Sequence, residues 1–167
     1  MQDSNMEKLI EQAKGRDPDA FAELMQRQMK SMYRVALAIL MNDEDTADAI
    51  QDAILACWEK MHTLRKPEYF RTWLTRILIN KCYDIRKRRG AVRDPEPYPE
   101  PSACDEYNLE LKEALGSLDE KYRVAITLFY GGGYRTDEIA RLLKIPRSTV
   151  QTRLQRGRAK LAEYYGR

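Results

Sequence analysis

The sequence predicts an all-α protein in which two small helical domains are joined by an extended linker. Apolar residues recur at three- and four-residue intervals along nearly the whole chain, as expected for helices with one buried face. Four prolines at positions 95, 97, 99 and 101 interrupt this pattern, and prolines at that spacing cannot lie in a helix. The length of 167 residues suffices for two domains with modest cores.

Four helices are predicted in the first domain, residues 1–90, which we call the N-terminal module. A capping box of Ser4 and Glu7 predicts a short helix that ends near Gly15. Asp17 followed by Pro18 is a typical helix start, and the helical pattern then continues to about residue 41. Two further helices are predicted over residues 44–61 and 68–89, with a loop at 62–67 between them.

The linker is predicted over residues 91–104, where prolines alternate with acidic residues. Such a segment is extended and semi-stiff, and at about 3.1 Å per residue it reaches on the order of 45 Å. We therefore expect the two domains to move independently until a partner fixes them. The second domain, residues 105–167, is the C-terminal module, with helices predicted over 105–115, 117–130, 136–143 and 147–165. A capping box of Ser117 and Glu120 opens the second of these.

Charge is distributed in blocks although the net charge is only +3. Residues 61–90 carry a net charge of +7 and residues 135–167 a net charge of +6. Residues 43–60 and 94–113 are acidic, at −5 and −6. Two basic blocks separated by an acidic stretch predict two separate contacts with a polyanion. Because acidic segments flank each block, we expect the isolated chain to bind duplex DNA only weakly.

The residue inventory argues against several classes of protein. The only histidine is His62, and the three cysteines show no CxxC pairing, so neither a metal site nor a disulfide framework is expected. No catalytic site and no cofactor are predicted, because no acid, base and nucleophile converge in an ordered pattern. The chain shows neither a signal core nor an apolar run of membrane-spanning length, so we expect a cytoplasmic protein with no insertion into a membrane.

The predicted helix over residues 44–61 has two faces. Its core face is expected to hold Ala47, Ile50, Ile54, Cys57, Trp58 and Met61. The opposite face carries Asp48, Gln51, Asp52, Leu55 and Glu59. An acidic face usually means solvation only, but an exposed leucine in its middle favours a surface that docks on another protein.

The predicted helix over residues 68–89 combines an apolar inner face with a polar stripe. Arg76, Asn80 and Lys87 lie on this stripe, and Leu64, Arg65 and Lys66 lie in the loop beside it. An asparagine among basic residues can read a base while its neighbours hold phosphates. The loop could shape a pocket for an unstacked base. Trp73 is interpreted as a core residue, because tryptophan at such a position is more often buried than a stacking platform.

Residues 135–158 carry the pattern of a helix-turn-helix. Ile139, Ala140 and Leu143 give the first helix an apolar face, and Val150 and Leu154 give the second a buried seam. The remaining positions of the second helix suit base edges and phosphates: Arg147, Ser148, Thr149, Gln151, Thr152, Arg153, Gln155, Arg156 and Arg158. Lys144 occupies the turn position where a left-handed backbone is usual, at a cost of about 1 kcal/mol.

Three runs together carry a family resemblance: ADAIQDAILACWEKM, YFRTWLTRILINKCYDIRKRRG and LGSLDEKYRVAITLFYGGGYRTDEIARLLKIPRSTVQTRLQRGRAKL. In this order and spacing, over residues 19–161, the chain resembles the extracytoplasmic-function (ECF, group 4) sigma factors of the sigma-70 family. The resemblance departs from the usual pattern at Arg135, where serine is common, at Lys144, where glycine is common, and at Leu64, where some relatives have an aromatic residue.

The resemblance implies roles for both modules. The N-terminal module would be sigma region 2, docking on the core of bacterial RNA polymerase through the face that holds Leu55 and reading the −10 promoter element with the loop and stripe. The C-terminal module would be sigma region 4, which reads the −35 element. An anti-sigma factor, membrane-anchored or soluble, would be a further partner. The alternative is a conventional helix-turn-helix regulator with an N-terminal sensing module, but that reading leaves the basic stripe over 65–89 unexplained.

Overall fold

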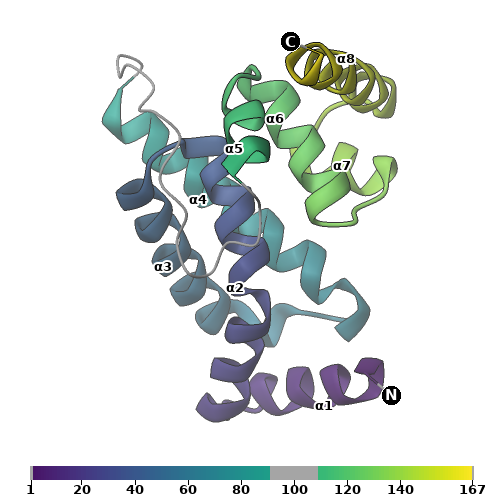
Figure 1. The fold of residues 1–167 in the computed structure, drawn as a ribbon. Helices are drawn as coiled ribbons and strands as arrows, with labels where there is room; N and C mark the ends of the chain where they lie inside the picture. Colours follow the sequence, from purple (N-terminus) through teal and green to yellow (C-terminus); the bar gives the residue numbers. More distant parts are fainter. Residues whose placement is uncertain (1, 91–108, 167) are drawn as a thin grey trace.

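A computed structural model describes residues 2–90 and 109–166, and in these ranges it contains helices and turns only, which confirms the all-α prediction (Figure 1). The linker predicted over 91–104 and the start of the helix predicted from 105 lie outside the described residues. No helix in the described ranges is both long enough and apolar enough to cross a membrane.

The N-terminal module begins with two helices joined by a tight turn. Helix α1 spans Gln2–Lys14 and helix α2 spans Pro18–Leu40. The Asp17 carboxylate accepts hydrogen bonds from the backbone N–H of Asp19 (3.0 Å) and of Ala20 (3.3 Å), and Pro18 fills the first turn. The predicted start of this helix is therefore confirmed. It ends at Met41, whose backbone is left-handed with φ 52°.

Two further helices complete this module. Helix α3 spans Asp43–Lys60, and Asn42 caps it by accepting the backbone N–H of Asp45 at 2.8 Å. The predicted loop contains two short 3-10 turns, η1 (Met61–Thr63) and η2 (Pro67–Tyr69). Helix α4 spans Phe70–Arg89 and packs against both α2 and α3.

The C-terminal module is built from shorter helices. Its elements are α5 (Leu109–Gly116), α6 (Glu120–Ile126), a π-helical turn η3 (Thr127–Gly131), α7 (Thr136–Leu143) and α8 (Arg147–Tyr165). Helix α8 packs on α6 and α7, and its C-terminal part contacts α5. In Figure 1 this module lies above and to the right of the N-terminal helices.

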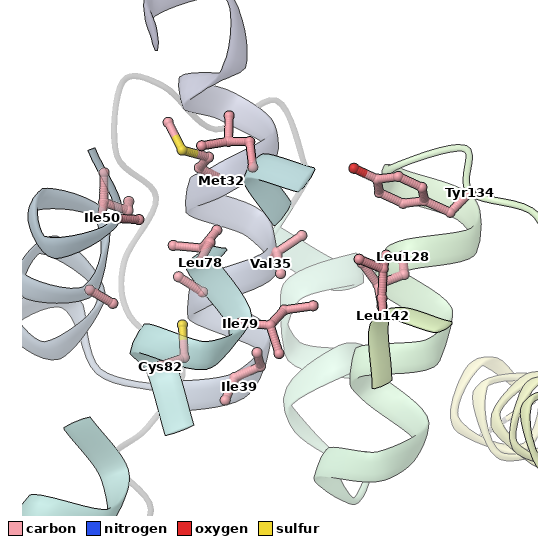
Figure 2. Packing of buried hydrophobic residues seen from close by; sticks show 14 of the residues in the cluster. Met32, Val35, Ile39, Ile50, Leu78, Ile79, Cys82, Leu128, Tyr134 and Leu142 are labelled. Atoms are coloured by element: carbon pink, nitrogen blue, oxygen red, sulfur yellow. The ribbon is translucent and has the colours of Figure 1, made fainter. Parts of the chain in front are cut away.

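One continuous apolar cluster runs through both modules. Val35 and Ile39 of α2 and Ile79 of α4 face Leu128, Tyr134 and Leu142 of the C-terminal module (Figure 2). Helix α2 contacts α6 and η3, and α4 contacts α7. The structure thus differs from the expectation that the modules move independently: they share a buried seam, because the α2 and α4 surfaces that face away from α3 are also apolar.

Three local predictions were wrong. Ser4 does not cap a helix, because α1 already begins at Gln2. Ser117 does not open α6: its hydroxyl donates to the Ala114 carbonyl at 2.6 Å, at the end of α5, and α6 begins at Glu120. Ala47 is exposed, and Ala49, Ala53 and Ala56 take the core positions of α3. Small residues on this face let α3 approach α4 closely.

Candidate nucleic-acid interface

The predicted docking face of α3 lies on the outside of the molecule. Leu55 is 62% exposed, the highest exposed fraction among the large hydrophobic side chains that the structure describes. Asp48, Gln51 and Glu59 are exposed around it and Asp52 is half-buried. With Lys81, Asp84, Lys87 and Arg88 of α4, the residues Asp52, Leu55, Ala56 and Glu59 line a shallow groove between the two helices.

Ion pairs tie the acidic face of α3 to the basic end of α4. Arg89 Nη2 lies 2.9 Å from Asp45 Oδ1 and 3.5 Å from Asp48 Oδ2. Arg88 Nη2 lies 3.7 Å from Asp52 Oδ2. The Arg88–Asp52 and Arg89–Asp48 pairs are partly exposed and add little stability, whereas Asp45 is buried where it meets Arg89. Together the three pairs hold the last turn of α4 over α3.

The polar stripe of α4 is continuous and open. Arg76, Asn80 and Lys87 are all exposed and recur at four- and seven-residue steps, so they follow one line along the helix. Arg65 and Lys66 are exposed in the loop, and the Lys66 ammonium lies 5.9 Å from the centre of the Tyr69 ring. Leu64 is only 4% exposed, so it supports the loop from beneath.

A cleft at the edge of this stripe is lined by residues of both modules, an arrangement that the sequence pattern does not predict. The N-terminal module contributes Thr63, Leu64, Arg65, Glu68, Tyr69, Thr72, Trp73 and Arg76 to its walls, and α7 with its N-cap contributes Arg135, Glu138 and Arg141. Four arginines and two aromatic rings suit a nucleotide chemically. The arginines were visible in the sequence, but nothing in their spacing placed α7 beside the loop.

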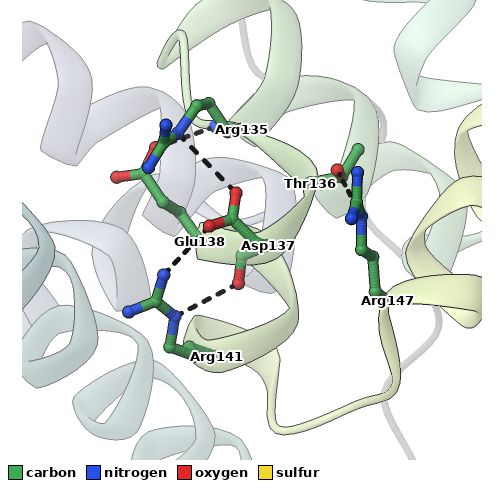
Figure 3. Close-up of polar contacts among 6 residues, drawn as sticks. All are labelled: Arg135, Thr136, Asp137, Glu138, Arg141 and Arg147. Atoms are coloured by element: carbon green, nitrogen blue, oxygen red, sulfur yellow. Dashed lines mark hydrogen bonds and ion pairs between the residues drawn. The ribbon is translucent and has the colours of Figure 1, made fainter.

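Local contacts order the start of α7 (Figure 3). The Glu138 carboxylate accepts the backbone N–H of Arg135 at 3.0 Å, which caps the helix without the serine common in the family. Arg141 Nη2 donates to Asp137 at 3.0 Å, and Arg147 Nε donates to the Thr136 hydroxyl at 3.2 Å. Partial desolvation would raise the pKa of Asp137, but the nearby guanidinium of Arg135 and the contacts with its own backbone and with Arg141 lower it overall.

The helix-turn-helix has the predicted geometry. Helix α7 ends at Lys144, which is left-handed with φ 58° and ψ 45°, so that expectation is confirmed. Val150, Leu154 and Gly157 of α8 are buried. The side chains of Arg147, Ser148, Gln151, Thr152, Gln155, Arg156 and Arg158 are exposed, and those of Thr149 and Arg153 are partly exposed. Helix α8 therefore presents a polar, cationic face on a fixed apolar seam, as a recognition helix does.

Two residues outside α8 extend this face. Lys121 of α6 lines a shallow pocket with Ser148, Thr149, Thr152, Arg153 and Arg156, beside the ring of Tyr122. Tyr130 accepts a hydrogen bond from Arg158 Nη1 at 3.1 Å. Neither residue was predicted, because they lie on a different helical segment and only the fold brings them to α8.

The thiols of Cys57 and Cys82 are core groups. Burial raises the pKa of the Cys57 thiol to about 12, and it raises that of Cys82 to about 12 against the opposing effect of Arg86. Both thiols are therefore protonated at neutral pH and sit in the core, as predicted. Within the described ranges no group of histidine, cysteine and acidic side chains could hold a metal ion.

An all-helical fold with an exposed polar stripe in one module and a helix-turn-helix in the other is typical of DNA-binding proteins. Comparisons with known proteins specify it further. Residues 24–92 match the family model for sigma-70 region 2, and residues 108–161 match the model for sigma-70 region 4. The chain is 32% identical to the ECF RNA polymerase sigma factor SigM of Mycobacterium tuberculosis over 168 residues, covering 98% of this chain and 85% of that protein.

Solved structures agree with this match. The structure of CnrH in complex with the cytosolic domain of CnrY has a TM-score of 0.69 and 28% identity, and the match covers 96% of each chain. The sigma factor RpoE of Bartonella quintana, solved with the anti-sigma factor NepR, has a TM-score of 0.73 at 22% identity, covering 86% of this chain and 97% of that one, and shares the fold. The chain belongs to the ECF sigma factors of the sigma-70 family.

Proposed function

We propose that this chain joins the core of bacterial RNA polymerase through α3, and that it then directs the polymerase to promoters by reading the −10 element with α4 and its preceding loop and the −35 element with α8. The observation that carries this proposal is the separation of three exposed surfaces on one helical scaffold. Each has the chemistry that its proposed role requires.

The α3 face suits a protein partner. Leu55 would insert into an apolar socket, while Asp48, Asp52 and Glu59 would meet cationic groups around it. Gln51 offers both a donor and an acceptor beside the leucine. An anchoring apolar side chain surrounded by charges of one sign is a common arrangement at protein–protein hot spots.

The α4 stripe suits a single strand of DNA. Arg65, Lys66 and Arg76 would hold phosphates, and Asn80 would hydrogen-bond to a base edge exposed by strand opening. Lys87 would extend the phosphate track toward the groove with α3. Leu64 would contribute indirectly, because its buried side chain holds in place the loop that shapes the base pocket.

The α8 face suits duplex DNA. Ser148, Thr149 and Gln151 lie in the first turns, which enter the major groove in helix-turn-helix proteins. Thr152, Arg153 and Gln155 would follow along the groove, with Arg147, Arg156 and Arg158 toward the backbone.

The same reasoning extends to regulation and location. An anti-sigma factor is proposed as a partner because the structures of CnrH and RpoE that match this chain are complexes with CnrY and with the anti-sigma factor NepR. Promoter DNA and polymerase core are in the cytoplasm, so we place the chain there.

Run-off transcription tests the proposal directly. Purified core alone and core with the full chain are incubated with a fragment library of genomic DNA, and the transcripts are sequenced. We expect chain-dependent transcripts whose start sites share −35 and −10 sequences at a fixed spacing. Tight, sequence-specific binding of duplex DNA by the free chain, together with no association with core, would instead identify a conventional helix-turn-helix regulator.

A further inference from the structure

Tyr83 is an exposed aromatic residue in the second half of α4. Its side chain is 40% exposed, whereas Cys82 and Ile85, on either side of it in the sequence, are buried in the core. A single exposed tyrosine is ordinary on a protein surface and carries no argument by itself. The position of Tyr83 on the helix does carry one.

Tyr83 lies on the polar stripe of α4. The stripe already contains Arg76, Asn80 and Lys87, and steps of four, three and four residues through position 83 stay on one face of a helix with 3.6 residues per turn. Tyr83 follows Asn80 by three residues and precedes Lys87 by four. Along the helix axis its ring therefore stands about 4.5 Å from the amide position and about 6 Å from the ammonium position.

Arg86 supports the ring of Tyr83. The guanidinium of Arg86 lies 5.2 Å from the ring centre. Arg86 is itself held in place, because it donates a hydrogen bond to the Ile39 carbonyl at 2.9 Å and pairs with the Glu120 carboxylate. The ring thus has a fixed cation beside it, and its exposed part is open to another planar group. A side chain that is already ordered loses less conformational entropy when it binds.

The charges around Tyr83 favour a nucleic acid over a protein segment. Arg76 and Lys87 place cations on the stripe before and after the ring, and Arg86 stands beside it. The neighbouring carboxylate of Asp84 lines the groove with α3, and Tyr83 is not among the residues that line this groove. Aromatic rings between phosphate-binding cations are typical of surfaces that bind single-stranded nucleic acid, where bases stack on the rings and the backbone follows the cations.

We propose that Tyr83 stacks on an unpaired base of the DNA strand that follows the α4 stripe, between the base edge read by Asn80 and the phosphate held by Lys87. Every base has an aromatic face, so the stack tolerates any sequence. Tyr83 therefore stabilises the opened strand, while Asn80 reads its sequence. The identity of this strand as promoter DNA rests on the proposed function, whereas the stack itself can be tested without a promoter.

Three variants separate the ring from its surroundings. Tyr83→Leu keeps an apolar side chain and removes the flat ring, and Tyr83→Phe keeps the ring and removes the hydroxyl. Tyr165→Leu is the matched control, because Tyr165 is 48% exposed at the end of α8 in the other module. Since both positions are exposed, circular dichroism should show the same helix content and the same thermal midpoint as in the parent.

Stacking is measured with two oligonucleotides that carry the same phosphates, a short oligothymidylate and an abasic oligomer of equal length. Fluorescence anisotropy at low salt gives the affinity of the full chain for each. We expect Tyr83→Leu to lower the affinity for oligothymidylate about fivefold or more, as the loss of one base–aromatic stack does, and to leave the affinity for the abasic oligomer unchanged. Tyr83→Phe and Tyr165→Leu should match the parent on both. An equal loss on both oligomers, or a parent that does not prefer the oligomer with bases, overturns the stack.

The second measurement uses the chain combined with polymerase core, on a promoter recovered by run-off transcription. Permanganate modifies unpaired thymines, so it reports opening of the −10 element. We expect Tyr83→Leu to reduce this reactivity about fivefold and to bind core as the parent does. Unchanged opening overturns the role of the stack at promoters, and lost binding to core assigns the ring to a protein interface and overturns the proposal. Absence of chain-dependent transcripts from the parent overturns the proposed function, while the oligonucleotide result still decides the stack.

Discussion

Gly157 of α8 lies directly against Ile126 of α6. A Cβ at position 157 would stand 2.9 Å from Ile126 Cγ1 and 3.1 Å from its Cδ1, and 3.5 Å from the Cβ of Tyr122. Glycine inside a helix costs about 1 kcal/mol relative to alanine, so its presence in the middle of α8 requires a reason. The reason is this close crossing, which sets how the recognition helix sits on the rest of the module.

We predict that Gly157→Ala destabilises the chain although it improves helix propensity. Overpacking costs about 1–3 kcal/mol, while the propensity gain is about 1 kcal/mol, so a net loss of up to about 2 kcal/mol in the free energy of unfolding is expected. Chemical denaturation followed by circular dichroism measures it. The penalty should shrink in an Ile126→Ala background, where the contacting atoms are absent. A penalty that is the same in both backgrounds would rule out this contact as its cause.

Much of the fold follows from local chemistry that the sequence displays. Asp17 and Pro18 start a helix because the carboxylate accepts the free backbone N–H groups of the first turn and the proline ring fixes φ near its helical value. Lys144 takes the left-handed turn position of the helix-turn-helix. Leu55 was predicted to be exposed from the apolar period of its helix, and it is. These inferences need only neighbours within one or two turns, which is why they could be made without a structure.

The seam between the modules could not be predicted in this way. Val35 and Ile79 are apolar and periodic, so the pattern indicates burial, but it does not say which element covers them. Tyr134 and Thr75 are 59 residues apart and lie on opposite sides of the predicted linker. The proline-rich linker suggested separation, whereas apolar area on two faces of α2 and α4 favours docking. The capping box at Ser117 failed for a related reason, since a serine that could begin one helix instead ends another.

Alkaline pH should weaken the fold through Cys57 and Cys82. Burial raises both thiol pKa values from an ordinary 9.0 to about 12. The stability that the two buried thiols contribute is fully present below pH 9 and is lost as the pH rises toward 12. In that window the thiols ionise only in the unfolded chain, so rising pH favours unfolding. At pH 10.5 the loss is about 2 kcal/mol per thiol.

The measurement is the free energy of unfolding at pH 8 and at pH 10.5, in the parent and in a variant with both cysteines replaced by alanine. At pH 8 the free energy of unfolding of the variant should be lower than that of the parent, because the substitutions create cavities. Between pH 8 and pH 10.5, however, this free energy should fall less in the variant than in the parent. An equal decline would assign the pH dependence to other groups. At pH 8, alkylation followed by mass spectrometry should leave both thiols unmodified in the native chain.

Charge reversal on α3 should weaken binding to polymerase core strongly and leave the fold intact. In the variant Asp52→Lys with Leu55→Glu, the apolar anchor and one carboxylate are replaced on an outer face. A lost hot spot costs about 2 kcal/mol or more, so affinity for core should fall about 30-fold or more. The exposed pair of Asp52 with Arg88, at 3.7 Å, contributes about 1 kcal/mol at most, so the midpoint of unfolding should barely change.

Fluorescence titration of labelled chain against core measures this affinity, with Glu11→Lys as the control. Glu11 is an exposed residue of α1, away from the groove, and its reversal should leave core binding unchanged. Undiminished affinity in the double variant would remove α3 as the docking surface.

On α8, substitutions should separate base reading from phosphate binding. Gln151 is exposed in the second turn of the helix, and Arg153 follows on the face shared with Lys121. Gln151→Ala and Arg153→Ala should therefore each lose about 1–3 kcal/mol of discrimination between a matched and a mismatched −35 element.

Arg158 lies one turn beyond Leu154 and donates a hydrogen bond to Tyr130. Arg158→Ala should weaken binding to all DNA sequences about equally and lower the slope of log affinity against log salt by about 1. We expect Lys121→Ala to behave like Arg158→Ala, because a lysine outside the recognition helix is expected to contact phosphates rather than base edges. Each variant is combined with core, and promoter binding is titrated on both templates at two salt concentrations. If all four substitutions reduce binding to the matched and the mismatched template by the same factor, α8 contacts only the DNA backbone. The −35 selectivity must then come from another part of the chain.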